Sequence, residues 1–339
     1  MILIRADANK NIGVGHVMRC LSIANALKVI GEEVVFVTAD NSADNIIDRA
    51  GFEHVVLNSE WNDFNKELGR IDKVIDRYCP NTMLIDSYYI NKKYFTNIRE
   101  KCKVAYVDDI NEMCWPLDYL INYNIYSSVY DYSLYENTDT KLLLGTEYTP
   151  LREEYHFLNI SSIPQRAKNI LISAGGSDPE NITMKILSNT VCNKELRNCK
   201  FHFVIGALNP KINEIKTFAK KSSNVELHIN ESRMSKLMCE CDIAISASGT
   251  TLYELCSCGV PTITYTLADN QLIAASQFEK LGIMLNAGDC RNNDSFIYNL
   301  EQLLIGLVTD HERRSVMSKK MREIVDGKGA NRIAQEIIR

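Results

Sequence analysis

The stretch MILIRADANKNIGVGHVMRC, residues 1–20, decides the fold. Its apolar run ILIR predicts a buried β-strand, and the residues from His16 to position 30 have the apolar spacing of an amphipathic helix. Two glycines, Gly13 and Gly15, stand between the strand and the helix, where the chain has to turn tightly. A strand, a glycine-containing turn and a helix form the first unit of a doubly wound α/β fold.

The same alternation of short β-branched runs and longer amphipathic runs continues along the chain. In the first half the apolar runs predict strands at 2–5, 34–39, 54–57, 82–86, 103–108 and 119–122, with helices at 16–30, 63–79 and 91–101. In the second half they predict strands at 168–173, 200–205, 224–229, 241–246 and 260–265, each followed by a helix-like run. Strands that alternate with helices predict parallel sheets with right-handed crossovers.

A change of composition near residue 150 divides the chain. Residues 148–168 carry two prolines and many polar side chains before the next strand begins, as a linker would. The sequence therefore predicts two Rossmann-like domains, residues 1–155 and 156–339, that face each other across a ligand cleft. The segment 316–339 predicts a helix, a glycine break and a last short helix, and no pattern assigns that last helix to either domain.

Composition and charge narrow the class of protein. The chain has 339 residues, of which 45% are hydrophobic and 24% charged, and its net charge is −5. A nucleic-acid partner is not expected, because binding phosphates along a strand requires a basic surface. No apolar stretch reaches the roughly 20 residues that span a bilayer, so no membrane partner is expected. The sequence turns polar after four residues, unlike a secretion signal, so we expect a cytoplasmic protein. The sequence leaves the oligomeric state open and is compatible with a monomer.

The eleven cysteines are interpreted as reduced thiols, because an odd number at irregular spacing forms no disulfide framework. In two pairs, Cys239 with Cys241 and Cys256 with Cys258, the cysteines are two residues apart, so on a helix their side chains would lie on different faces. We interpret them as buried apolar residues and not as zinc ligands. The five histidines other than His16 are interpreted as structural. No metal and no cofactor are expected.

Two glycine loops of the second half could bind a phosphate group. Gly249, Thr250 and Thr251 follow a predicted strand, open a helix and are preceded by Ser248, and Glu254 one turn later could accept ribose hydroxyls. The alternative is that Thr250 only caps the helix, with Glu254 near the capping-box position. The second loop consists of Gly175, Gly176 and Ser177 before Pro179, and its alternative is an ordinary tight turn.

His16 stands at the start of the first predicted helix, where the helix dipole favours the neutral imidazole. A neutral histidine in a cleft is a competent general base, and the alternative is a surface histidine that caps a loop. Gly13 and Gly15 lack the third glycine of the dinucleotide fingerprint, so NAD is not expected. Of the neighbouring acids Asp108 and Asp109, whose side chains diverge, we expect only one to enter a site.

Six stretches together carry a resemblance to a known family. They are RADANKNIGVGHVMRCLSIA (5–24), IDSYYI (85–90), YVDD (106–109), LLLGTEYTPLREEY (142–155), SAGGSDPEN (173–181) and LADNQ (267–271). With these residues the chain resembles the UDP-sugar hydrolases of the pseudaminic acid pathway, the PseG-like family with its spore-coat polysaccharide relatives. Ser248 departs from that pattern, since it stands where a second glycine is expected.

The resemblance implies a two-domain GT-B-type fold and hydrolysis of UDP-2,4-diacetamido-2,4,6-trideoxy-β-L-altropyranose to free sugar and UDP. Cleavage would occur at the anomeric carbon, with inversion and without metal. His16 matches the family's catalytic histidine and Asn270 an asparagine of the catalytic region, while Glu254 matches the ribose ligand and loop 248–251 the diphosphate site. Tyr88 matches a tyrosine that faces the sugar. The further residues that we expect at the sugar are Asp7, Gly15, Arg19, Asp86, Asp108 and Gln271.

UDP is a good leaving group, so one base that activates water could suffice, with helix N-termini stabilising the diphosphate. The rival function is a glycosyltransferase that passes the sugar to a hydroxyl acceptor, with the same fold and the same base. A nucleotide-sugar binding protein without catalysis would leave His16 without a task.

Overall fold

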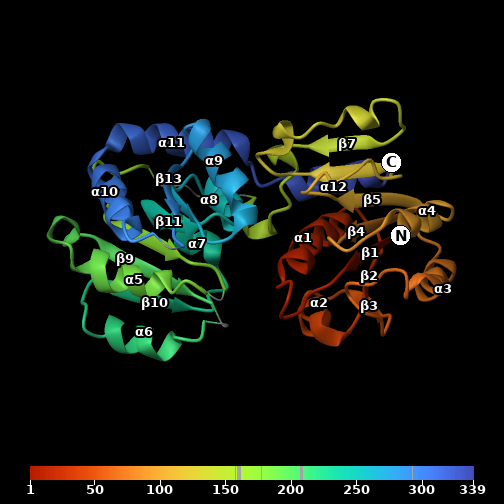
Figure 1. Ribbon diagram of the computed structural model, residues 1–339, viewed down its shortest axis with the longest axis horizontal. Helices are drawn as coiled ribbons and strands as arrows, with labels where there is room; N and C mark the ends of the chain where they lie inside the picture. Colours follow the sequence, from red (N-terminus) through yellow and green to blue (C-terminus); the bar gives the residue numbers. More distant parts are fainter. Residues whose placement is uncertain (157, 159–161, 177, 207–208, 292) are drawn as a thin grey trace. The chain divides into compact units, whose positions relative to one another are not determined.

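The computed structural model describes residues 1–339 except 157, 159–161, 177, 207–208 and 292 (Figure 1). The chain forms two compact units. The first consists of Met1–Glu153 together with Gly327–Arg339, and the second consists of Glu154–Asp326. Among the described residues, no helix has the length and apolar character needed to cross a bilayer.

A parallel sheet forms the centre of the first unit. Its seven strands follow the order β3-β2-β1-β4-β5-β6-β7. The strands are β1 (Ile2–Ala6), β2 (Val34–Thr38), β3 (Glu53–Val56), β4 (Thr82–Asp86), β5 (Lys103–Val107), β6 (Tyr119–Asn122) and β7 (Lys141–Leu144). The helices are α1 (Gly15–Val29), α2 (Asp44–Arg49), α3 (Leu68–Tyr78), α4 (Lys92–Arg99) and, from the end of the chain, α12 (Gly329–Ile337).

Burial on both faces explains why the central strands are continuous apolar runs. Every residue of β1 and β4 is buried. Leu3 and Met83 join a core to which α3 and α4 contribute, whereas Ile2 and Ile4 point to the opposite face and are equally buried. A strand covered on both sides is typical of a doubly wound sheet.

The second unit repeats this plan with six parallel strands in the order β10-β9-β8-β11-β12-β13. The strands are β8 (Asn169–Ser173), β9 (Lys200–Ile205), β10 (Val225–Ile229), β11 (Ile243–Ala247), β12 (Thr262–Thr266) and β13 (Leu285–Asp289). The helices are α5 (Ile182–Asn189), α6 (Ile212–Ala219), α7 (Met234–Cys239), α8 (Thr251–Cys258), α9 (Leu272–Lys280), α10 (Phe296–Thr309) and α11 (His311–Ile324). The two doubly wound α/β units confirm the predicted fold class.

Each sheet has one point at which the strand order reverses direction. In the first unit it lies between β1 and β4, and in the second between β8 and β11. Connections leave these neighbouring strands toward opposite sides, which opens a crevice at their carboxyl ends where open α/β sheets bind ligands. The loop with Gly13 follows β1, and the loop with Gly249 follows β11, so the predicted site segments stand at both reversal points.

The sequence analysis predicted eleven strands and missed β7 and β13. Both are terminal strands of their sheets, with a single neighbouring strand each. The segment of β13, LNAGD, is half-buried and contains polar residues and glycine, so it lacks the apolar run that marks a central strand.

The predicted domain boundary needs one correction, at the C-terminus. The sequence analysis placed all of 156–339 in the second domain, but Gly327–Arg339 belong to the first unit. Helix α12 packs against α1 and buries Ile333 and Ile337 completely (Figure 1). Gly329 begins this helix against the backbone of Thr149, where a Cβ atom would lie 2.2 Å from the carbonyl oxygen. Only glycine fits there.

Candidate active site

The loop between β1 and His16 is stabilised by hydrogen bonds among its own residues. Asn9 and Gly13 exchange two backbone hydrogen bonds of 3.2 and 2.8 Å, and the Asn9 side chain accepts from the amides of Asn11 and Ile12. Gly13 has a φ of 71°, a conformation that favours glycine. Four amides, those of Asn9, Asn11, Ile12 and Gly13, are thus used inside the loop, which places the start of α1.

His16 lies against the carboxylate of Asp86 at the end of β4. His16 is buried, and its Nδ1 lies 2.6 Å from Asp86 Oδ1 and 3.0 Å from Arg19 Nη2. A guanidinium only donates and a carboxylate only accepts, so the shorter contact requires a proton on Nδ1. This tautomer leaves the lone pair on Nε2. A histidine held in this way by a carboxylate can accept a proton on Nε2.

Arg19 balances the charge of Asp86. Its Nε and Nη2 each lie 2.5 Å from one oxygen of the carboxylate, in a bidentate pair. Burial alone would raise the pKa of Asp86, but Arg19 and His16 outweigh it and hold this pKa well below its usual range. The thiol of Cys20 donates to Asp86 Oδ2 at 3.6 Å. Asp86 therefore stays ionised at neutral pH and orients His16.

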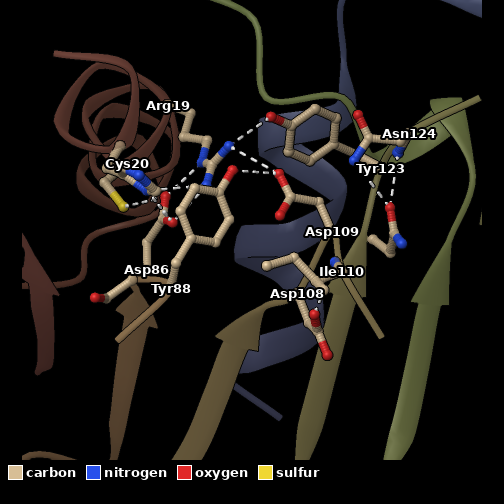
Figure 2. A network of polar contacts seen from close by, with 12 residues as sticks. Arg19, Cys20, Asp86, Tyr88, Asp108, Asp109, Ile110, Tyr123 and Asn124 are labelled. Carbon is tan, nitrogen blue, oxygen red and sulfur yellow. Dashed lines mark hydrogen bonds and ion pairs between the residues drawn. The ribbon is translucent and has the colours of Figure 1, made fainter. Parts of the chain in front are cut away.

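Two residues that the sequence analysis did not place in the site complete this group, Asp109 and Tyr123 (Figure 2). The Tyr88 hydroxyl donates to Asp109 Oδ2 at 2.9 Å, and Arg19 Nη1 donates to the Tyr123 hydroxyl at 3.0 Å. Arg19 Nη1 also lies 3.6 Å from Asp109 Oδ2. Burial, followed by Asp109, raises the pKa of Tyr88, so this hydroxyl remains a donor.

Tyr88 forms the exposed wall of the group. Its ring stands edge-on to the His16 imidazole at 4.9 Å, and 43% of the residue is exposed. An aromatic ring beside a base, with one side open, can pack against the apolar face of a sugar. Four predicted residues, His16, Arg19, Asp86 and Tyr88, thus come together at one reversal point.

Asp108 has a different task from its neighbour. Its Oδ1 accepts from the backbone amides of Ile110 and Asn111 at 3.0 and 2.9 Å, and Figure 2 shows the carboxylates of Asp108 and Asp109 pointing apart. Burial raises the pKa of Asp108. The sequence predicted that only one of the two acids enters the group. That acid is Asp109, whereas the predicted sugar ligand Asp108 shapes the loop.

Asp7 also departs from its predicted role as a sugar ligand. One of its oxygens accepts from the Ala39 amide at 2.7 Å, and the other from Arg5 Nη1 at 2.6 Å. Arg5 is fully buried and forms a second, bidentate pair with Glu67, both bonds being 2.9 Å. We call Arg5, Asp7 and Glu67 the Arg5 cluster. Both carboxylate oxygens of Asp7 are thus occupied by groups of the protein itself.

In the second unit, the loop after β11 is fixed from below by Ser248. This residue is buried, and its hydroxyl lies 2.7 Å from Thr264 Oγ1 and donates to the Tyr265 carbonyl at 2.8 Å. Gly249 and Thr250 are exposed at the start of α8, and the Thr250 side chain makes no capping hydrogen bond. The Ser248 side chain, predicted to contact the diphosphate, is thus occupied inside the protein, and Gly249, Thr250 and Thr251 are the candidates that remain in this loop. Glu254 is half-buried in the first turn of α8.

The glycine loop after β8 faces a helix end that already holds a carboxylate. Asp178 accepts from the amides of Ile182 and Thr183 at 2.8 and 3.0 Å, at the point where α5 begins. Gly175 and Gly176 are exposed, and Ser177, a predicted nucleotide ligand, lies outside the described residues. A carboxylate at this helix end disfavours a second anion there. The loop after β11 is the better candidate for a phosphate group.

Asn270 and Gln271 lie in a short 3-10 turn, Asp269–Gln271, after β12. Asn270 is exposed, whereas the Gln271 side chain accepts from the Leu267 amide at 3.0 Å and so shapes the turn. Both residues belong to the second unit and His16 belongs to the first.

Three curated proteins are similar to this chain in sequence. The UDP-2,4-diacetamido-2,4,6-trideoxy-β-L-altropyranose hydrolase of Campylobacter jejuni is 25% identical over 251 residues, which cover 73% of this chain and 85% of the relative. A Helicobacter pylori protein named pseudaminic acid cytidylyltransferase and UDP-2,4-diacetamido-2,4,6-trideoxy-β-L-altropyranose hydrolase is 27% identical, covering 83% of this chain and 47% of the relative. The Bacillus subtilis spore coat polysaccharide biosynthesis protein SpsG is 27% identical over 59% of this chain and 56% of its own length. The chain thus spans about half the length of the last two relatives.

Solved structures are similar to this chain in fold, and a family model matches part of it. MurG of Acinetobacter baumannii superposes with a TM-score of 0.72 at 12% identity, covering 99% of both chains. The spinosyn rhamnosyltransferase SpnG superposes with a TM-score of 0.68 at 10% identity, covering 98% of this chain and 99% of that one. The family model of lipid-A-disaccharide synthetase matches residues 152–271, less than half of the chain. The chain has a GT-B fold of two Rossmann-like units and resembles the PseG-like UDP-sugar hydrolases and their spore-coat relatives.

Proposed function

We propose that this protein hydrolyses a UDP-linked diacetamido-trideoxy sugar to the free sugar and UDP, in the biosynthesis of a pseudaminic-type nonulosonic acid or a surface polysaccharide. The observation that carries the proposal is the contact of 2.6 Å between His16 Nδ1 and Asp86 Oδ1, which leaves Nε2 as a base. The names of the Campylobacter and Helicobacter relatives support the substrate class.

In the proposed reaction His16 Nε2 takes a proton from a water molecule as the water oxygen attacks the anomeric carbon. The bond from that carbon to the diphosphate oxygen breaks, and its electron pair leaves with UDP. Because water attacks opposite UDP, the free sugar forms with inverted configuration. Asp86 stabilises the imidazolium that results, and Arg19 keeps Asp86 ionised.

The leaving diphosphate is assigned to the start of α8. Gly249, Thr250 and Thr251 are the small residues at this helix N-terminus, where amide groups and the helix dipole favour an anion. Glu254, in the first turn, is assigned to the ribose hydroxyls. We keep Asn270 as the residue that orients water or the sugar, and its exposed amide leaves it accessible to a ligand.

The reaction is tested by incubating the purified protein with the UDP-sugar in isotopically labelled water, without an acceptor and with a chelator present. Proton NMR of the first product reports the anomeric configuration, and mass spectrometry reports which product carries the label. Label in the sugar and an inverted anomer are expected. Label in UDP would mean cleavage at phosphorus and would remove the role of His16 as base toward carbon.

A glycosyltransferase is the second candidate, and the match of residues 152–271 to the lipid-A-disaccharide synthetase model favours it. The same base would then deprotonate an acceptor hydroxyl in place of water. UDP release that occurs only after a hydroxyl acceptor is added would support the transferase and contradict the hydrolase.

A further inference from the structure

Two strands of the second unit bring two histidines and a glutamate together. In the parallel register of β9 and β10, His202 lies beside Glu226, and His228 follows two residues later on the same face. The neighbours of His202 in the chain, Phe201 and Phe203, point to the other face and belong to the core. The three polar side chains therefore share the face opposite that core.

The distances between their ligand atoms suit one metal ion. His202 Nδ1 lies 3.1 Å from His228 Nε2, Glu226 Oε2 lies 3.8 Å from His202 Nδ1, and Glu226 Oε1 lies 3.8 Å from His228 Nε2. A tetrahedral zinc ion with bonds near 2.0–2.1 Å separates its ligands by roughly 3.3 Å. Among the described residues, this is the one group of three or more such side chains whose ligand atoms converge.

The outer ring nitrogen of His202 explains why its inner one can bind a cation. His202 Nε2 lies 3.4 Å from Asn169 Oδ1, and His228 Nδ1 lies 3.7 Å from Glu231 Oε2. When His202 Nε2 carries the proton that Asn169 Oδ1 accepts, His202 Nδ1 has a free lone pair, which lies 3.1 Å from His228 Nε2 and can bind a cation. Glu231 lies beyond hydrogen-bond distance of His228 Nδ1 and fixes no tautomer of that ring.

An ordinary surface ion pair does not account for this arrangement. Lys200 lies 2.5 Å from Glu226 Oε2, but 51% and 45% of these side chains are exposed, and pairs of this kind contribute little. Burial, followed by Lys200 and His228, lowers the pKa of His202, which keeps the imidazole neutral. Imidazole and carboxylate ligands suit zinc and its neighbours in the transition series better than magnesium.

We propose that His202, Glu226 and His228 form a binding site for a divalent transition-metal ion of the zinc type. The fourth position is left to water, because Glu226 is exposed. The site joins the terminal strand β10 to β9 and so stabilises the edge of the second sheet. It uses none of the residues assigned to hydrolysis, and it replaces the structural role that the sequence analysis gave to these histidines.

The test is a calorimetric titration of the chelator-treated full chain with zinc, and in parallel with magnesium. We expect one zinc ion per chain at this site, no magnesium binding, and a higher melting temperature with zinc. The variant His202→Gln/His228→Gln should bind zinc at least ~10-fold more weakly, because even the mutation of a residue that only hydrogen-bonds to a metal ligand can cause a loss of this size. Equal affinity of this variant and the wild type, or no zinc binding by the wild type, overturns the proposal.

Three controls separate this site from other ligands. His54→Gln should leave zinc binding unchanged, because Asp44 and Asp48 contact opposite ring nitrogens of His54, at 3.2 and 3.3 Å. Lys200→Gln should tighten zinc binding, since it removes a positive charge that lies 2.5 Å from the Glu226 carboxylate and repels the ion. A sulfur-to-cobalt charge-transfer band on substitution with cobalt would place the ion on cysteines and overturn the assignment.

Glu226 is exposed, so its replacement leaves the core of the second unit intact. Glu226→Gln keeps the size of the side chain and removes one ligand, so it should weaken zinc binding in the same direction as the histidine variant. Circular dichroism of each variant without metal checks that it is folded. A folded Glu226→Gln protein with undiminished zinc affinity would exclude Glu226 from the site.

Discussion

The first unit contains two clusters in which an arginine meets carboxylates, and they differ in what they leave open. The Arg5 cluster is closed: the side chains of Arg5 and Glu67 have no exposed surface, the Tyr94 hydroxyl donates to Glu67 at 2.7 Å, and Arg5 lies over the Phe64 ring. Burial alone would lower the pKa of Arg5, but Asp7 and Glu67 raise it above its usual value. The cluster is therefore a fixed set of charges.

The group around Asp86 uses the same chemistry for a different result. Here the carboxylate contacts Arg19 on one side and a histidine on the other, and the exposed ring of Tyr88 stands beside that histidine. A buried ion pair by itself indicates structure. In this group His16 adds a ring nitrogen, Nε2, that the Arg19–Asp86 ion pair does not use and that lies beside the exposed ring of Tyr88. Such a nitrogen indicates a site for chemistry. The predictions below test this distinction.

Replacement of the base should have the largest effect. His16→Ala should lower kcat by ~10²–10⁴-fold, the usual contribution of a general base. The measurement is UDP release from the UDP-sugar by wild type and variant. His54→Ala, which removes a histidine paired with Asp44 and Asp48 in the same unit, is the matched control and should keep its activity. Near-wild-type turnover by a folded His16→Ala protein would sink the assignment.

Opening the closed cluster should affect folding and not catalysis. Glu67→Gln removes the charge opposite Arg5 in a fully buried pair, and such a loss destabilises a protein by about 3–5 kcal/mol. Urea unfolding measures this difference. At a temperature where both proteins are folded, kcat should agree within about twofold, the scatter expected away from the site. A large loss of kcat would show that the Arg5 cluster is coupled to the reaction.

Neutralising the orienting carboxylate should reduce activity by roughly 10²-fold. Asp86→Asn can hold His16 in the wrong tautomer and no longer stabilises the imidazolium. The loss should appear in kcat more than in KM, as expected for an interaction made in the transition state. An unchanged kcat would mean that Asp86 only binds Arg19.

The same substitution should change how stability depends on pH. The pKa of Asp86 is lower in the folded chain than in the unfolded one, so its contribution is complete above the ordinary carboxyl pKa near 4. It declines as pH falls below that value toward the folded pKa. The difference in unfolding free energy between wild type and Asp86→Asn should therefore shrink as pH falls below about 4. A difference that grows in acid would contradict the lowered pKa.

Tyr88→Phe should have the smallest effect. It removes the hydrogen bond of 2.9 Å to Asp109 but keeps the ring, so we expect a loss of about 1 kcal/mol, near fivefold in kcat/KM. Tyr123→Phe, which removes the bond of 3.0 Å from Arg19, is the companion variant. A loss above 100-fold in either would place a phenol in the chemistry, beyond the positioning role assigned here.

The parts of the fold that sequence predicted are those where burial leaves a single pattern. Strands such as β1 and β4 are buried on both faces and read as apolar runs, whereas the terminal strand β13 does not. The position of α12 was out of reach, because an amphipathic helix shows which face it buries and not which partner covers that face.

The candidate site divides along similar lines. His16 and Asp86 could be named because His16 stands at the start of the helix after β1 and Asp86 is the last residue of β4, the two strands that flank the reversal point. Which of Asp108 and Asp109 turns toward Arg19 depends on a loop conformation that Asn111 and Ile110 help to fix, and no pattern of single residues encodes it. Tyr123 carried one usable signal, since it directly follows the predicted strand 119–122.

The return of α12 to the first unit has a consequence for how the protein is made. The second unit is one continuous segment, Glu154–Asp326, and can complete its core as soon as that segment has left the ribosome. The first unit lacks Ile333 and Ile337 until residues 327–339 have been made, which is after the whole of the second unit. The usual order, in which the amino-terminal domain folds first, is thus reversed for its final packing step. During synthesis the face of α1 that packs against α12 therefore stays uncovered until α12 has been made.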